Sequence, residues 1–346
     1  MAEVALTVNG QIWGGWTSVR IQRSIEQIAG QFSLGLTERW PGQPDRREIS
    51  PGDSCTVAID GRVVITGRVD DVEVSFDGNA HAVTVSGRDA TGDLVDCSAE
   101  HRPGQWQGRT LLQIASELCR PFGVPVRAEV DIGKAFGDQT LQKGETVFEI
   151  IERLCRHRAV LAVSDGRGGL VFTRAGAARV GLILQEGKDG NILAARGTFS
   201  HRDRFSRYTV LGQAAGSDFT SPEDNSEPAA VATDPMVRRH RPLIVLAEDQ
   251  GDGASFAARA AWEARVRAGR ARRAEVTVQG WSHAAGLWQP NGLVRLDSPW
   301  LRIAADMLIA GVEFTLDERG STTTLSLVRP EAFELTALPE KESVGW

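Results

Sequence analysis

Short stretches in which apolar residues recur at every second position, separated by Asp-Gly turns, dominate the first hundred residues. Cys55, Val57 and Ile59 follow this spacing, and Asp60-Gly61 comes directly after them. Val72–Phe76 repeats the spacing and is followed by the turn sequence Asp77-Gly78-Asn79. A period of two broken by Asp-Gly is typical of antiparallel hairpins. Because a meander must hide its edges, such a chain usually closes into a small barrel or sandwich.

The period changes between about residues 100 and 180. Thr110-Leu-Leu-Gln113 and Thr146-Val-Phe-Glu149 both have the sequence of a helix capping box. Each opens a one-sided apolar stripe, and each stripe ends in Leu-Cys-Arg. The second helix leads into 159–173, which is predicted to be strand, turn and strand. We therefore expect a small α/β domain inserted after the first β unit.

The last third of the chain contains a predicted Arg-rich helix over 255–273 and then returns to β. Pro290–Leu327 faintly repeats the order of strands and turns of Pro51–Val85. Chance similarity between two meanders is the alternative to a true internal repeat. The acidic segment Ser217–Pro228 is expected to be a long loop, and its role stays open.

These patterns predict an α+β chain that is mostly β, with two related small β-barrel domains. The first barrel is expected over 1–98, with 183–215 as a candidate to complete it. The inserted α/β domain covers 99–182, and the second barrel, with the Arg-rich helix, covers 216–346. A length of 346 residues is sufficient for two or three domains.

No sequence pattern points to catalysis, so we expect no catalytic, cofactor-binding or metal-binding residue. Nucleophile elbows, zinc-binding helices and phosphate loops are all missing from the sequence. The Gly-rich segment Asp165–Gly169 is expected to be a hairpin turn rather than a phosphate cradle, because strands flank it. All four cysteines are predicted to be reduced core residues. The N-terminal residues lack the basic and apolar regions of a signal peptide, and no apolar run is long enough to span a bilayer.

Tryptophan and arginine supply the candidates for subunit contacts. The chain has nine Trp but one Tyr, and many Trp fall in predicted loops or strand ends, where they either plug a barrel or meet another subunit. The Arg-rich helix is expected to be solvated or to pack on acidic neighbours of another subunit. Nucleic-acid binding is the less favoured alternative, since the net charge is −6. The candidate contact residues are Trp13, Trp16, Trp40, Arg259, Arg265, Trp281 and Trp288.

A series of segments in this order resembles the central baseplate hub proteins of contractile-tailed bacteriophages, specifically the Mu-like tail protein family. The segments are Val8–Gly10, Gly15–Ile21, Arg23–Ser33, Pro51–Asp53, Ile59–Gly61, Thr66-Gly67, Gly87–Ser98, Gly144–Glu149, Leu154–Arg156, Arg241–Leu243, Gly280-Trp281, Trp288–Asn291 and Pro330–Phe333. Gly87–Ser98 and the collinear order of the segments give this resemblance its specificity.

The resemblance implies a structural hub in the baseplate of a phage or prophage tail, made in the host cytoplasm. It implies a homotrimer whose paired β-barrels form a pseudo-sixfold ring between the sixfold tail tube and the threefold central spike. Implied partners are therefore the chain itself, the tube protein, the spike protein and other baseplate proteins. DNA would pass only through the channel, and no membrane insertion is expected. From the net charge of −6 we expect a mildly acidic lumen. The alternative is a tail-associated protein that binds or degrades the cell wall.

Overall fold

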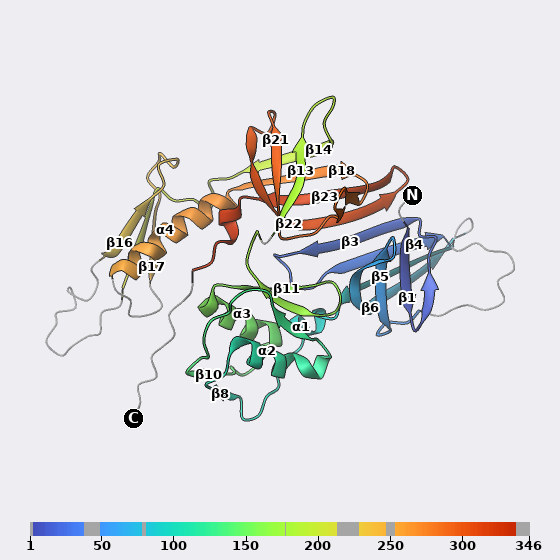
Figure 1. Ribbon diagram of the computed structural model, residues 1–346, viewed down its shortest axis with the longest axis horizontal. Coiled ribbons are helices and arrows are strands. Elements are labelled where there is room, and N and C mark those ends of the chain that lie inside the picture. Colours follow the sequence, from blue (N-terminus) through green and yellow to red (C-terminus); the bar gives the residue numbers. More distant parts are fainter. Residues whose placement is uncertain are drawn as a thin grey trace.

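The structure is a computed structural model that describes residues 3–37, 49–77, 81–176, 178–212, 228–246 and 253–336. Strands predominate, and the largest sheet has 13 of them (Figure 1). Two β units form this sheet, a helical insert lies below their junction, and a small module containing α4 lies at one end of the molecule (Figure 1).

The first β unit is an antiparallel sheet in the order β3-β4-β7-β6-β5-β1-β2. Its strands are β1 (Val4–Val8), β2 (Gln11–Trp13), β3 (Ser18–Ser24), β4 (Gln31–Thr37), β5 (Ser54–Ile59), β6 (Arg62–Phe76) and β7 (His81–Asp89). The turn between β5 and β6 falls at Asp60-Gly61, where both residues have positive φ (47° and 73°). This confirms the Asp-Gly hairpin there and fits the tolerance of Asp and Gly for left-handed backbone.

The helical insert packs three helices against small strands. It contains α1 (Gly92–Asp96), β8 (Gln105–Gln107), α2 (Leu111–Cys119), β9 (Val126–Ala128), β10 (Asp138–Thr140), α3 (Val147–Arg158), β11 (Leu161–Ser164) and β12 (Leu170–Thr173). Both predicted capping boxes are confirmed, with Thr110 capping α2 and Thr146 capping α3. The buried stripes of the two helices form a core of their own with Phe136 and Phe172.

The second β unit pairs in the order β14-β18-β23-β22-β21-β13. Its strands are β13 (Ala178–Gln185), β14 (Ile192–Phe199), β18 (Arg272–Gln279), β21 (Gly292–Ser298), β22 (Ile303–Asp317) and β23 (Gly320–Val328), with the short pair β19 (Ser282–His283) and β20 (Gly286–Leu287) beside them. The described part of the 183–215 candidate, 183–212, therefore does not complete the first unit, and 213–215 lie outside the described residues. β13 and β14 pair with β21 and β18, whereas β15 (Arg207–Leu211) joins a separate sheet.

The two units repeat one pairing order. β3-β4-β7-β6-β5-β1 of the first unit corresponds to β14-β18-β23-β22-β21-β13 of the second. The long central strands β6 and β22 have 15 residues each, and both carry a bulge near the middle. One pairing differs, because β1 is antiparallel to β5 but β13 is parallel to β21. The internal similarity seen in the sequence is thus a repeat of topology.

The expectation of two small β-barrel domains is not met in the described residues, where the two units share one sheet and neither closes into a barrel. β22 pairs with β21 through Ile303–Leu308, then extends beyond it and pairs with β3 through Gly311–Leu316. The length of β22 therefore joins the second unit to the first. The prediction of a mostly β fold holds.

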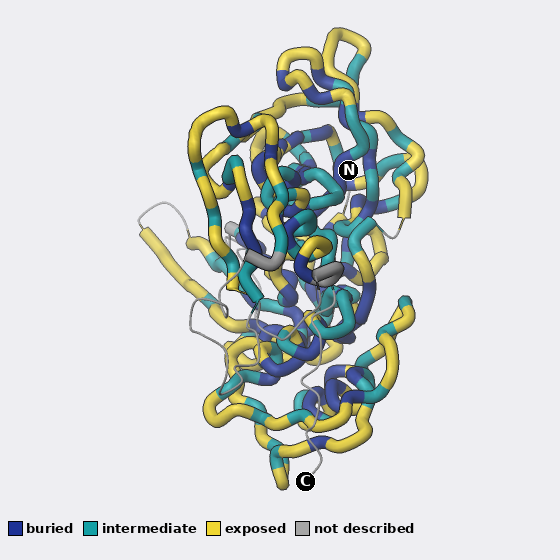
Figure 2. Tube along the Cα trace, turned by 90° about the vertical axis from the view of Figure 1, so that its left-hand side faces the viewer, coloured by how far each residue is buried: buried dark blue, intermediate teal, exposed yellow. Residues whose placement is uncertain are grey.

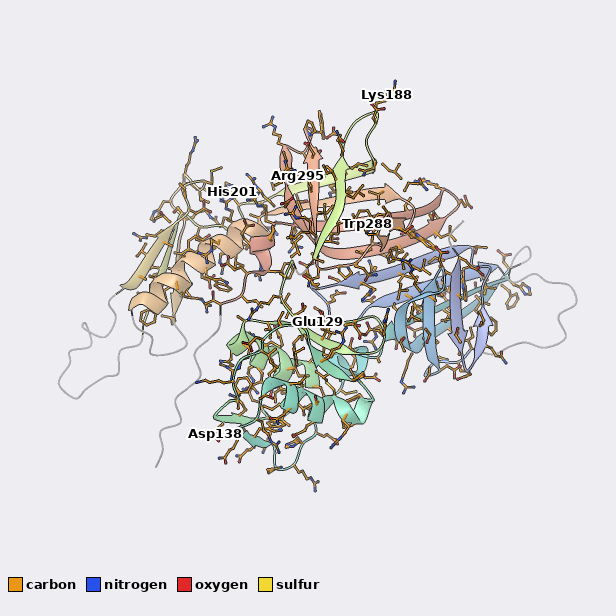
Figure 3. All side chains as sticks on the ribbon, viewed as in Figure 1. Glu129, Asp138, Lys188, His201, Trp288 and Arg295 are labelled. Carbon is orange, nitrogen blue, oxygen red and sulfur yellow. The ribbon has the colours of Figure 1, made fainter. Side chains whose placement is uncertain are left out.

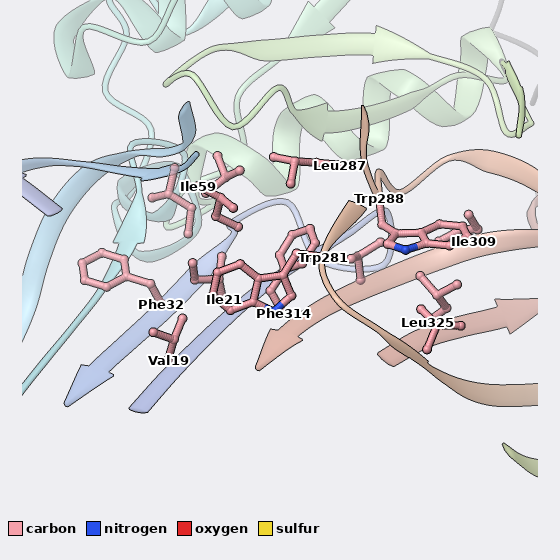
Figure 4. Close-up of a cluster of buried hydrophobic side chains, with 14 of the residues drawn as sticks. Val19, Ile21, Phe32, Ile59, Trp281, Leu287, Trp288, Ile309, Phe314 and Leu325 are labelled. Atoms are coloured by element: carbon pink, nitrogen blue, oxygen red, sulfur yellow. The ribbon is translucent and has the colours of Figure 1, made fainter. Parts of the chain in front are cut away.

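One apolar core runs through both units. Ile21, Phe32 and Ile59 of the first unit lie in the same cluster as Trp281 and Phe314 of the second (Figure 4). The Trp281 and Phe314 rings meet edge to face, with their centroids 6.3 Å apart. Buried segments accordingly continue along the body of the molecule, with exposed segments at its rim (Figure 2).

The small module consists of β15, β16 (Pro228–Thr233), β17 (Pro242–Leu246) and α4 (Gly253–Arg270). β15 is the central strand, and Val210 on it packs with Phe256 and Ala260 of α4. The predicted helix over 255–273 is too long at its C-terminal end, because Arg272 and Arg273 lie in β18. Their alternation with Ala274 and Val276 in the sheet takes precedence over helix propensity.

Candidate subunit interface

The joint between the two β units is a strand pair with apolar residues on one side and polar residues on the other. Ile21 of β3 lies opposite Phe314 of β22, and both are buried. On the polar side, Arg20 Nη2 donates to Glu313 Oε2 at 3.0 Å, and Gln22 Nε2 also donates to that oxygen. The joint thus combines main-chain pairing, a buried apolar row and a polar row.

The first unit has a free strand edge on β6. β6 holds the same place in the pairing order as β22, the strand that forms the joint in the second unit. β5 pairs with β6 only from Arg62 to Arg68, so in the part of the chain that the structure describes, 71–76 pairs with β7 alone. Val74 and Phe76 face the same side as core residue Val85 but are 70% and 82% exposed. Two apolar side chains at an unpaired strand edge are suited to a partner.

The second unit has the complementary edge. β14 pairs with β18 on one side and, within the described ranges, with no strand on the other. Its counterpart β3 is paired on both sides, by β4 and by β22. Leu193 and Phe199 of β14 are more than half exposed.

The structure places six of the seven candidate contact residues, and their surroundings are of three kinds. Trp16, Trp281 and Trp288 are buried in the core of a single chain, where they offer no surface to a second chain (Figure 3 shows Trp288 within the second unit). Trp13 is half-buried against the same core. Trp40 lies outside the described residues.

The two arginine candidates form ion pairs within their own chain. Arg259 pairs with buried Glu263, which also pairs with Arg267, and the Arg259 guanidinium stacks on Trp262. Arg265 forms a two-bond pair with Glu334, at 2.7 and 3.0 Å. Much of the positive charge of the helix is therefore balanced inside the chain.

Sequence reasoning missed the exposed apolar residues of the two free edges and also Trp300, which is 84% exposed. The sequence did contain a signal that could have identified the free edge of β6. Val72-Glu-Val-Ser-Phe-Asp77 in β6 and the following residue matches Val312-Glu-Phe-Thr-Leu-Asp317 in β22. The second segment forms the joint, so the first could have been recognised as its equivalent.

A polar cluster holds the helical insert at the junction of the two units. Asp89, at the end of β7, is buried and accepts hydrogen bonds from the backbone N–H groups of Gly30 (2.8 Å) and Thr91 (3.0 Å). Burial raises the pKa of Asp89, against these hydrogen bonds. Loss of water around the Arg23 guanidinium lowers the pKa of Arg23, and the charges of Asp89 and Asp165 oppose that shift.

The Gly-rich segment Asp165–Gly169 contributes to this cluster and is the hairpin turn between β11 and β12, as predicted. Asp165 Oδ1 accepts hydrogen bonds from the backbone N–H groups of Arg167 and Gly169. Gly166, with φ of 73°, approaches both Val64 and Arg23 so closely that a Cβ would lie 2.5 Å from the Val64 carbonyl oxygen. The glycines here serve the turn and its close packing.

Titratable and metal-ligating residues form no further site in the described residues. Within those ranges, no group of three His, Cys, Asp or Glu side chains could hold a metal ion. All four cysteines are free, but the prediction that all lie in the core is wrong for Cys97, which is exposed. Burial raises the pKa of the Cys55 and Cys119 thiols to about 12. No helix in the described part of the chain is long and apolar enough to cross a membrane.

Comparison with solved structures shows where this architecture occurs. The 43 kDa tail protein of prophage MuSo2 from Shewanella oneidensis is 37% identical, with a TM-score of 0.86 and coverage of 96% of this chain and 100% of that one. The tail protein from Neisseria meningitidis MC58 is 26% identical, with a TM-score of 0.79 and coverage of 98% and 99%. The fold and its paired β units are thus those of phage tail proteins.

Sequence comparison narrows the class. Baseplate hub protein gp44 of Escherichia phage Mu is 38% identical over 341 residues, which is 95% of this chain and 88% of gp44. Family models match four consecutive parts of the chain: Mu phage baseplate assembly protein GpP-like, N-terminal (3–89); baseplate hub protein gp44-like, second domain (91–174); tail protein NMB1110-like, third domain (204–261); and Mu phage baseplate assembly protein GpP, fourth domain (253–336). The chain belongs to the Mu-type baseplate hub family. The expected structural role in a phage or prophage baseplate is confirmed.

Proposed function

We propose that this chain is the central hub of a contractile tail, a homotrimer that forms a pseudo-sixfold ring between the tail tube and the central spike. The observation that carries the proposal is the repeat of two β units with one pairing order inside each chain. Three such chains present six similar units, which suits contact with a sixfold tube on one face and a threefold spike on the other. Other baseplate proteins would bind the outside of this ring.

The polar face of the shared sheet supports a channel through the ring. Arg20, Gln22, Glu275, Glu313 and Ser326 line one hollow on it, away from the apolar core. Arg20 pairs with Glu313, and nearby Arg273 pairs with Glu26, so charges of both signs are present there. In this proposal the face lines the lumen. Balanced charge on this face, in place of the mildly acidic lumen expected from the net charge of −6, would let DNA pass without binding tightly, because phosphate attraction needs uncompensated cations.

The chain would act mechanically and not as a catalyst, in the baseplate of a virion assembled in the host cytoplasm. The alternative of a cell-wall-degrading tail protein predicts turnover of peptidoglycan by the isolated chain. Nothing in the described geometry favours that alternative, and a hub requires no such turnover.

Mass measurement and imaging test the proposal. Light scattering on the purified chain should give a particle of three times 37.4 kDa, and electron microscopy should show a ring with a central hole. A stable particle of one chain at all concentrations would overturn the hub proposal. Release of soluble fragments from purified peptidoglycan would overturn its purely structural character.

A further inference from the structure

The geometry points to one specific contact between copies of this chain: residues 71–76 of β6 pair antiparallel with β14 of a second copy. This inference rests on the homotrimer proposed above and specifies how its chains join. It is drawn from the joint between β22 and β3 inside each chain, because both free edges have a paired equivalent there.

Cross-strand partners give the equivalence residue by residue. The connected series are Val72–Val85–Leu34–Val19 in the first unit and Val312–Leu325–Val276–Ala195 in the second. β6 therefore corresponds to β22 with Val72 at the place of Val312, and β3 corresponds to β14 with Val19 at the place of Ala195. The sequences agree with this match, since Val19-Arg-Ile-Gln-Arg-Ser24 corresponds to Ala195-Arg-Gly-Thr-Phe-Ser200.

Transfer of the joint's register to the two free edges fixes the contact. Leu316 lies opposite Val19 and Phe314 opposite Ile21 within one chain, so Phe76 falls opposite Ala195 and Val74 opposite Gly197 of the next. The two most exposed apolar side chains of β6 thus each meet a small residue of β14, and Val72 falls opposite Phe199. This pairing would cover Val74 and Phe76, which are 70% and 82% exposed in the single chain.

The polar side of the joint transfers as well. Arg20 and Glu313 form its ion pair, and their equivalents are Arg196 on β14 and Glu73 on β6. Both equivalents are exposed, and within the described residues neither forms an ion pair in its own chain. We expect Arg196 of one copy to pair with Glu73 of the next.

The contact is head to tail, because the two edges that meet belong to different β units of the chain, β6 to the first and β14 to the second. Repetition of such a contact closes into a ring when the rotation between copies allows it, and the ring leaves neither of these two edges unpaired. The occupant of each edge is therefore a second copy of this chain.

Disulfide trapping tests the register. In a Cys97→Ser background, which removes the exposed thiol, Ser75→Cys with Arg196→Cys places two cysteines directly opposite each other. Opposite residues of an antiparallel pair have Cα atoms about 4.5–5.5 Å apart, within the range of a disulfide. Oxidation should give covalent dimers and trimers on a non-reducing gel. The matched control, Asp71→Cys with Arg196→Cys, lies four residues out of register, about 13 Å away, and should give none.

A variant of the edge supplies a second readout. Phe76→Asp should raise the concentration at which the particle dissociates at least tenfold in light scattering. Met236→Asp, at another exposed apolar residue in the small module, should not. A trimer that is unaffected by Phe76→Asp, or that cross-links equally in both cysteine pairs, would overturn the edge contact and leave the hub proposal intact. A wild-type chain that stays monomeric would overturn both.

Discussion

Arg20 Nη2 lies 3.0 Å from Glu313 Oε2, and this contact joins β3 of the first β unit to β22 of the second across 293 residues of sequence. The pair lies on the polar side of the joint, and the joint connects the two units into one sheet. Its Arg20 side chain is 62% exposed, so solvent screens most of its charge. The apolar side of the same strands is buried, and there we expect most of the joint's stability.

The first prediction separates these two contributions. Phe314→Ala should lower the free energy of unfolding by about 3–5 kcal/mol, because it removes a buried ring from the shared core. Glu313→Ala should cost less than about 1 kcal/mol, since an exposed ion pair contributes little. Chemical denaturation of both variants measures the difference. Equal losses would show that the joint is held by charge, contrary to this account.

Gly166 and Gly168 provide a matched pair at the junction of the insert with the first unit. Both have positive φ, 73° and 86°, but a Cβ at Gly166 would meet the Val64 carbonyl oxygen at 2.5 Å, whereas one at Gly168 would meet Thr66 at an ordinary 3.5 Å. Gly168→Ala should cost about 1–2 kcal/mol for its left-handed backbone. Gly166→Ala should cost more and loosen the insert, seen as faster hydrogen exchange in β11 and β12. If the two variants exchange alike, the close approach is not a constraint.

Local patterns in the sequence predicted the local structure well. Thr110 and Thr146 cap their helices as expected, because a capping box needs only residues within one turn. Asp60-Gly61 and Asp165–Gly169 form their hairpin turns for the same reason. The topological repeat was also visible as a repeated order of strands and turns.

Long-range pairing was harder to predict. Nothing in the alternation of Val312–Leu316 says whether β22 ends with its own unit or continues to β3, so closed barrels were expected where the structure has one open sheet. The tryptophans misled for a related reason. Trp281 and Trp288 lie beside turns in the sequence, but the joining of two units buries them in a shared core. The residues suited to subunit contact were the less conspicuous Val74 and Phe76.

A buried ion pair should determine the stability of the small module. Arg204 Nε and Nη2 donate to the two carboxylate oxygens of Asp234 at 2.8 and 2.9 Å, and both side chains are less than one-tenth exposed. Asp234→Ala would leave a buried guanidinium without its partner, at a cost of about 3–5 kcal/mol.

An exposed ion pair on α3 is the matched control. Glu152→Ala removes the partner of Arg156 from a pair whose side chains are both half exposed, and it should cost under about 0.5 kcal/mol. Hydrogen exchange of the β15 amides measures the local effect of Asp234→Ala. Unchanged protection of β15 in that variant would contradict a structural role for the pair.

Buried thiols should make the fold less stable in alkali. Burial raises the pKa of Cys55 and Cys119 from 9.0 to about 12, so in this range the folded chain keeps protons that the unfolded chain releases. Their contribution to stability is therefore complete below pH 9 and is lost as the pH rises toward 12. Each thiol should lower the free energy of unfolding by about 1.4 kcal/mol per pH unit over that interval.

Single-cysteine variants isolate this effect from other groups that titrate in alkali. Cys119→Ala should reduce the slope of unfolding free energy against pH by the share of one thiol. Cys55→Ala should reduce the slope by a similar share, because burial raises the pKa of both thiols. Denaturation midpoints between pH 8 and 11 provide the measurement. A substitution that lowers the free energy of unfolding equally at every pH does not change its slope against pH. A slope that stays the same in Cys119→Ala would mean that this thiol ionises inside the fold as readily as outside it.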